Sequence, residues 1–339
     1  MIFERKNVIL EIITLIEEGK NISFFRKFLP RILLVSFSLV LFLHLGFLPS
    51  VAENVSSLIS ADCGEIICRS NGNSSSQLFI IGLSHRDALT RSNGNKTARI
   101  QEEVYRIGDR LIHREGVELL LPEGFLANKA PKIEVEKIKA ALKKSKCNGF
   151  PEMKEIEERL VDDKTYVNAE MLLNEYHPLK LRQVEDEQSY FAVRDSILKL
   201  VNTDKDSCDF SNIKSELDYL QERRTATLLQ RIPGIVDDEF RQGNIKAKKA
   251  IFTIGMAHIP KIIDYLNKGR IEIHSPISTP NRNEDYTAEL NLRKANFNVY
   301  VIISRTLADD PEVLKMNGLD KIVSSFRRQS FANSSKGLP

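Results

Sequence analysis

Two histidines of the chain follow the same short pattern. His85 ends the segment IIGLSH and His258 ends the segment TIGMAH, so each histidine stands three residues after a glycine. Glu123 follows the apolar run GVELLL and one proline. Two imidazoles and a carboxylate suit a divalent transition metal such as Zn²⁺, Mn²⁺ or Co²⁺, with one position left for water. Such an ion can generate hydroxide near neutral pH, which is the chemistry of metal-assisted hydrolysis.

Short strands must position these three groups. Each group follows an apolar, β-prone run, at residues 77–81, 116–121 and 250–255. In an open α/β sheet, polar groups at the carboxyl ends of the strands face the crevice where ligands bind. We therefore expect the two histidines and the glutamate to converge there. Gly82 and Gly255 would let the backbone turn sharply before each histidine.

An arginine pair adds a possible anion-binding group. Arg223 and Arg224 interrupt the apolar face of a helix expected over residues 215–232, and an arginine there could bind a carboxylate or an oxyanion. The alternative is a solvated helix face held by ion pairs one turn apart. The two histidines and Glu123 also have structural alternatives. Each histidine could be a polar residue at a strand end with its hydrogen bonds made, and Glu123 could be a solvated turn residue.

The remaining pattern predicts a single α/β domain. Further elements are expected as helices over residues 97–114 and from Pro260, and as strands at 270–273 and 297–303. The predicted architecture is a mixed central sheet with duplicated strand, Gly-x-x-His and helix units over residues 77–310, with a helical insert at about 132–245. A C-terminal helix and a polar tail should occupy residues 311–339, without regular structure from Arg327 onward.

The N-terminus resembles an export signal. Residues 32–48 form an almost continuous apolar run that follows three basic side chains, which should stay in the cytoplasm. Small residues up to Ala52 fit signal-peptidase cleavage, which would give a periplasmic or secreted protein. The run nearly reaches spanning length, so an uncleaved single-pass membrane anchor with the domain outside the cytoplasm is the alternative. Residues 1–52 are thus a signal peptide or signal anchor, and 53–76 a linker.

Four cysteines are compatible with an oxidising compartment. Cys63 and Cys68 stand close enough in sequence to favour a local disulfide, which would leave Cys147 to pair with Cys208. No cysteine and histidine cluster has zinc-finger spacing.

Charge and composition argue against nucleic acid as a partner. The 49 basic and 46 acidic side chains are spread along the whole length, with a net charge of +3, and do not form a one-faced basic stripe. The chain lacks tryptophan. A peptide or a small molecule is the expected substrate class, and the membrane is a partner only if the N-terminal segment is uncleaved.

The order of the motifs GLSH, PEG, ERR and GMAH resembles the TraB/TIKI superfamily, which includes TraB/GumN, Tiki-like metalloprotease, ChaN-like and erythromycin-esterase-like proteins. The resemblance spans roughly residues 77–305. It implies metal ligation by His85, His258 and Glu123, with Glu123 as ligand or general base. It also implies that Arg223 stabilises a developing oxyanion.

Three functions follow as hypotheses. The resemblance favours an extracytoplasmic, metal-dependent, peptidase-like hydrolase. A ChaN-like iron or haem-binding protein would use the same side chains as ligands without turnover. A catalytically degenerate relative is the third, because Pro122 and Arg224 depart from the family pattern.

Overall fold

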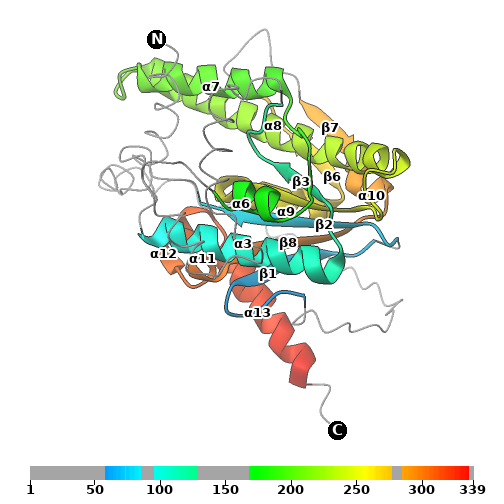
Figure 1. Ribbon diagram of the computed structural model, residues 1–339. Coiled ribbons are helices and arrows are strands. Elements are labelled where there is room, and N and C mark those ends of the chain that lie inside the picture. Colours follow the sequence, from blue (N-terminus) through cyan, green and yellow to red (C-terminus); the bar gives the residue numbers. More distant parts are fainter. Residues whose placement is uncertain (1–57, 73, 85–94, 128–167, 277–284, 336–339) are drawn as a thin grey trace, which may run out of the picture.

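The computed structural model describes residues 58–72, 74–84, 95–127, 168–276 and 285–335. It shows an α/β protein with one mixed central sheet between layers of helices, which confirms the predicted fold class (Figure 1). The apolar run at residues 32–48 lies outside the described residues. Within the part of the chain that is described, no helix combines the length and the apolarity needed to cross a membrane.

The central sheet has six strands in the order β1-β8-β2-β5-β3-β4. The strands are β1 (Gly64–Ser70), β2 (Gln77–Leu83), β3 (Leu119–Pro122), β4 (Lys180–Leu181), β5 (Lys249–Gly255) and β8 (Asn298–Ser304). β1 runs antiparallel to β8, and the other neighbours are parallel. The two strands that carry the Gly-x-x-His pattern, β2 and β5, therefore lie side by side with their carboxyl ends at the same edge.

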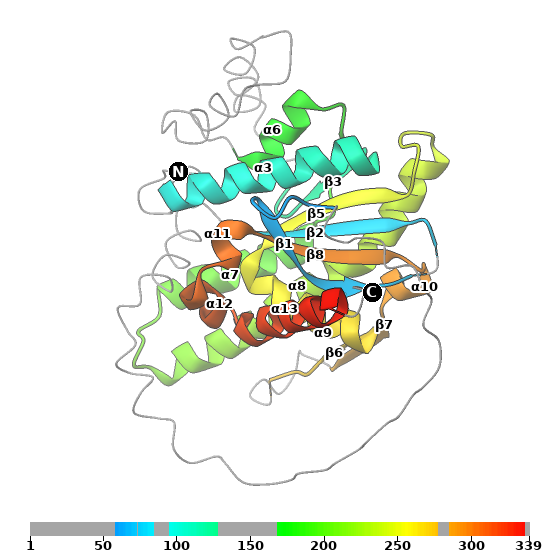
Figure 2. The same cartoon turned by 90° about the horizontal axis from the view of Figure 1, so that it is seen from below.

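Helices cover both faces of the sheet. Figures 1 and 2 place α3 (Asn95–Glu115) and α6 (Ala169–Tyr176) on one face, and α8 (Cys208–Arg241) and α9 (Ile259–Lys268) on the other. Because both faces are covered, the middle strands are apolar along almost their whole length, and they contribute fully buried side chains such as Phe79 and Phe252.

Short helices and a second small sheet complete the fold. The further helices are η2 (Met256–His258), α7 (Glu187–Val201), α10 (Asn291–Lys294), α11 (Arg305–Ala308), α12 (Pro311–Met316) and α13 (Asp320–Ser335). The strand expected at 270–273 is present as β6 (Arg270–Ile273), but it pairs with β7 (Tyr286–Glu289) in a separate two-stranded sheet. It therefore does not extend the central sheet.

Each helix of the insert that the structure describes starts with a side-chain cap. Asn168, Asp186 and Ser207 accept hydrogen bonds from the first-turn amides of α6, α7 and α8 respectively, which satisfies N–H groups that a helix leaves free. One short strand, β4, interrupts the insert, although the sequence showed almost no strand signal there. Its pairing with β3 explains why the strand forms.

Both ends of the domain differ from the sequence prediction. Residues 53–76 were expected to be a linker, but β1 lies within them and forms an edge of the central sheet. The expected loss of regular structure from Arg327 is also wrong, because α13 continues to Ser335. Arg327 donates hydrogen bonds to Glu65 of β1 at 2.6 and 2.9 Å. A contact between chain segments so far apart in sequence has no local signal.

Cys63, Cys68 and Cys208 are free thiols, and Cys147, the predicted partner of Cys208, lies outside the described residues. The predicted local disulfide between Cys63 and Cys68 is wrong, because β1 carries the chain away in extended form. Five residues of extended chain span about 16 Å, far beyond the Cα separation that a disulfide allows. Burial raises the pKa of the Cys68 thiol to about 11.

Candidate active site

Glu123 and His258 meet at the carboxyl edge of the sheet. β3 ends at Pro122 beside Thr253 of β5, so Glu123 begins the loop beyond one strand while the turn η2 carries His258 beyond the other. His258 Nε2 lies 3.3 Å from Glu123 Oε1. The other carboxylate oxygen, Oε2, accepts a hydrogen bond of 2.6 Å from the backbone N–H of Gly255. The convergence expected for these two side chains is therefore present.

The hydrogen bonds of Thr225 fix the orientation of the His258 ring. Thr225 is buried on α8, and its Oγ1 lies 2.6 Å from His258 Nδ1. The same hydroxyl donates its proton to the carbonyl of Gln221 at 2.8 Å. Since a carbonyl can only accept, the bond to the ring requires that Nδ1–H donates to Thr225. In neutral His258 the lone pair is then on Nε2, the atom that faces Glu123.

Arg224 joins Glu123 to a second, fully buried carboxylate. Its Nη1 donates to Glu123 Oε1 at 2.7 Å, while Nε and Nη2 donate to the two oxygens of Glu185. Glu185 also accepts the backbone N–H of Gly124 at 3.0 Å. Burial alone would lower the pKa of Arg224, but the charges and hydrogen bonds of the two glutamates raise it above its ordinary value.

This group, the Glu123 cluster, consists of Glu123, Glu185, Arg224, Thr225 and His258. It has one guanidinium charge against two carboxylate charges, so it carries one net negative charge when His258 is neutral. The side chains of Glu123, Glu185 and Arg224 are only 11%, 0% and 8% exposed. A buried excess of negative charge favours a cation, which protonated His258 or a metal ion would supply.

Arg224, and not the predicted Arg223, contacts Glu123, and it binds protein carboxylates. The guanidinium of Arg223 lies over the ring of Tyr286, 4.1 Å from its centroid, and so on another side of α8. Successive residues of a helix point about 100° apart. An interrupted apolar stripe does not define the helix phase that closely, so it does not show which of two adjacent arginines contacts Glu123.

His85 lies outside the described residues, so its predicted place beside Glu123 and His258 stays a prediction. Gly82 allows close packing: a Cβ there would lie 2.9 Å from Met256 Sδ. Gly255 has φ −59° and ψ 144°, a backbone conformation that any residue can adopt. The backbone at this position therefore does not make the sharp turn that was expected to require a glycine. The N–H group of Gly255 binds Glu123 instead.

Glu170 is a second carboxyl group close to Glu123. The Oγ1 of the fully buried Thr253 donates to Glu170 Oε1 at 2.7 Å. Burial, aided by the negative charge of Glu123, raises the pKa of Glu170 from 4.5 to about 7. A carboxyl group with a pKa near neutrality can exchange protons with a substrate at physiological pH. No motif points to Glu170, which lies in the helical insert on α6.

Replacing Glu170 with glutamine should change how stability depends on pH. Below about pH 4.5 the carboxyl group is protonated in both the folded and the unfolded protein. Between about pH 4.5 and 7 it loses its proton only in the unfolded protein. Stability of the parent should therefore fall as the pH rises through this window. In Glu170→Gln the free energy of unfolding should fall by about 1 to 3 kcal/mol less than in the parent over the same pH range.

Urea unfolding of Glu170→Gln and the parent at pH 4.5, 6 and 8 would measure this difference. Glu289→Gln, an exposed change, serves as the control. Parallel pH curves for Glu170→Gln and the parent would contradict the raised pKa.

A second group of side chains could hold a metal ion. Asp109 and His113 on α3 and His177 at the end of α6 each offer one ligand atom, and these atoms lie within 4.8 Å of one another. Neither histidine stands in a repeated motif, so the Gly-x-x-His pattern does not point to them. The spacing Asp109-x-x-x-His113 on a predicted helix was a usable signal, since it places both side chains on one face.

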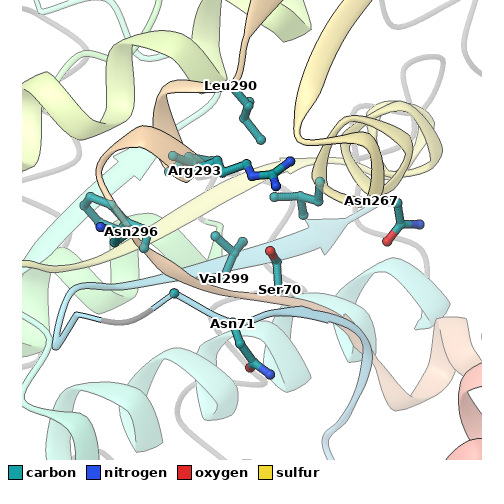
Figure 3. A pocket seen from close by; sticks show the side chains of 11 residues that line it. Ser70, Asn71, Asn267, Leu290, Arg293, Asn296 and Val299 are labelled. Atoms are coloured by element: carbon teal, nitrogen blue, oxygen red, sulfur yellow. The ribbon is translucent and has the colours of Figure 1, made fainter. Parts of the chain in front are cut away.

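Figure 3 shows a pocket elsewhere in the fold. It lies at the other edge of the sheet from the Glu123 cluster, because β8 runs parallel to β2 and β5. It has a volume of about 310 Å³, and Ser70 and Val299 line it at the amino end of β8. Arg293 is the charged side chain in its wall. The side chains of the Glu123 cluster do not line this pocket, so it does not extend that site.

The Glu123 cluster combines groups that suit hydrolysis. Glu123 can accept a proton, His258 presents Nε2 toward it, and Arg224 holds the carboxylate in place. Glu170 adds a carboxyl group that titrates near neutral pH.

Comparisons of the chain with protein families, with curated proteins and with solved structures found no match.

Proposed function

We propose that the protein is a metal-dependent, peptidase-like hydrolase that works at the carboxyl edge of the central sheet. The observation that carries the proposal is the 3.3 Å approach of His258 Nε2 to Glu123 Oε1 within a buried cluster of net negative charge. This is also the activity that the resemblance to the TraB/TIKI superfamily implies. Export across a membrane, from the run at residues 32–48, belongs to the same proposal.

The donor atoms fit a metal ion. Two ligands that each lie about 2.1 Å from a tetrahedral ion are about 3.4 Å apart, close to the 3.3 Å between His258 Nε2 and Glu123 Oε1. Metal-bound histidines usually donate their other ring N–H to a neighbouring oxygen, as Nδ1 does to Thr225. We propose His85 as the third ligand, and Zn²⁺, Mn²⁺ or Co²⁺ as the ion. When bound, such an ion would supply a polarised water.

The side chains of the cluster divide the remaining tasks. Glu123 accepts the proton of the attacking water, and Arg224 holds that carboxylate in position. Arg224 is thus a positioning residue, since both of its partners are protein carboxylates. Glu170, which is protonated part of the time at neutral pH, would return a proton to the leaving group.

A chelation experiment on the purified full-length protein tests the proposal. The chelated protein and samples refilled with Zn²⁺, Mn²⁺ or Co²⁺ are incubated with a mixed peptide library, and cleavage is read by mass spectrometry. We expect cleavage only in a refilled sample, and none with His258→Ala. His274→Ala is the matched control, because His274 is an exposed histidine that also contacts an aspartate.

Bound metal must be counted in the same samples. Because Asp109, His113 and His177 could hold an ion of their own, the count is made in a His113→Ala background. We expect one ion per chain there, and none after His258→Ala is added. Cleavage that survives chelation, or that His258→Ala leaves unchanged, would overturn the proposal. A metal-loaded protein that cleaves neither peptides nor small esters would do the same.

A further inference from the structure

Asp109, His113 and His177 form a compact group of potential ligands. Asp109 Oδ1 lies 3.4 Å from His113 Nε2 and 3.2 Å from His177 Nε2. Both imidazoles thus present Nε2 to the same carboxylate oxygen. Their rings meet edge to face, with centroids 5.3 Å apart. We propose that these three side chains bind a divalent zinc-class ion at a site separate from the Glu123 cluster.

The two distances from Asp109 are close to those of a tetrahedral zinc site, and the two imidazole nitrogens lie within 4.8 Å of each other. Ligand atoms about 2.0 to 2.2 Å from the ion are about 3.3 to 3.5 Å apart at the tetrahedral angle, and both contacts of Asp109 are close to this range. Two histidines and one carboxylate form a known three-ligand set for zinc. Two neutral imidazoles and one carboxylate leave a bound divalent ion with one net positive charge, so no further protein charge is needed.

Exposure leaves one side of this site open. The side chain of His177 is 3% exposed, whereas those of Asp109 and His113 are 34% and 47% exposed. The ion would therefore rest against the buried histidine and turn its fourth position to the solvent. That position would hold water or a small anion.

The group lies far from the Glu123 cluster. Gln101 marks the carboxyl edge on α3, because its side chain donates to the carbonyl of Ser84, just beyond β2. Asp109 follows eight residues later, about 12 Å further along the helix. His177 precedes β4, whose first residue, Lys180, donates to Glu118 just before β3 begins. The three ligands therefore belong to the amino edge of the sheet.

The position of the site gives the ion a structural consequence. It would join the last turns of α3 to the end of α6, where the helical insert returns to the sheet through β4. An ion that binds only the folded chain stabilises it in proportion to the logarithm of its concentration above Kd. Zinc should therefore raise the melting temperature through these residues whether or not the protein is an enzyme.

Spectroscopic titration with Co²⁺ and calorimetric titration with Zn²⁺ test the site on the chelated full-length protein. The variants are Asp109→Asn and His113→Ala, both at partly exposed positions, with His274→Ala as the matched control. We expect the parent and His274→Ala to show the visible absorption of tetrahedral Co²⁺ and a zinc-dependent rise in Tm. Both variants should lose about a hundredfold or more in affinity for this ion.

His258→Ala separates this proposal from the proposed function. It should keep the ion at Asp109 and His113, whatever its effect on peptide cleavage. The proposal is overturned if His113→Ala and Asp109→Asn bind as many ions as the parent with equal affinity. It is also overturned if zinc raises the Tm of these variants as much as that of the parent. Circular dichroism spectra of the variants verify that they are folded.

Discussion

Glu123→Gln is expected to lower the kcat/KM of the proposed hydrolysis by about 10²- to 10⁴-fold, which is the usual contribution of a general base. Glutamine keeps the shape of the side chain and an oxygen that can accept from Arg224 or from the N–H of Gly255. It removes the negative charge, and with it a ligand of the proposed ion and the ability to take a proton from water. The loss should therefore appear mainly in turnover, with a smaller loss of stability because one of the two donors would face the amide NH₂ group.

Steady-state rates on a cleaved peptide, together with thermal unfolding, measure this effect. The Tm should fall only modestly, because Arg224 keeps its buried partner Glu185 and only one donor to residue 123 loses its acceptor. Glu289→Gln controls for the loss of a carboxylate from an exposed position. A Glu123→Gln enzyme with a kcat/KM within a few-fold of the parent would show that Glu123 is not the base. The role of Glu170 would then have to be reconsidered.

Arg224→Met is expected to lower the free energy of unfolding by about 3 to 5 kcal/mol, the range for breaking a buried ion pair. Methionine fills much of the arginine volume, but it leaves Glu185, which is fully buried, and Glu123 without their guanidinium partner. Two carboxylates would then share a poorly solvated space. Urea unfolding measures this loss. A lower midpoint with an unchanged m-value would show that the substitution changed stability.

The adjacent residue provides the matched control for this variant. Arg223→Met removes a guanidinium that lies over Tyr286, and such a contact contributes about 0.5 to 2 kcal/mol. Adding Glu185→Gln to Arg224→Met should restore part of the lost stability. Equal losses for the two arginine variants would contradict the assignment of Arg224 to the cluster.

The sequence predicted the sheet and the approach of Glu123 to His258 from local signals. Short β-prone runs end at both residues, and the carboxyl ends of parallel strands meet at one edge. The repeat of the Gly-x-x-His pattern pointed to the strands β2 and β5, which are neighbours in the sheet. Local patterns suffice here because strand direction and side-chain type are properties of short segments.

The tertiary structure decided which side chains complete the cluster and which segments complete the sheet. Arg224 rather than Arg223 contacts Glu123, and Glu185 and Thr225 join them from elements whose packing no local pattern encodes. His177 reaches Asp109 across 68 positions of sequence, and β1 pairs with β8 across the whole domain. Composition and periodicity indicate which face of a single helix or strand is apolar. The choice of partner faces depends on the packing of the complete core, which only the folded chain shows.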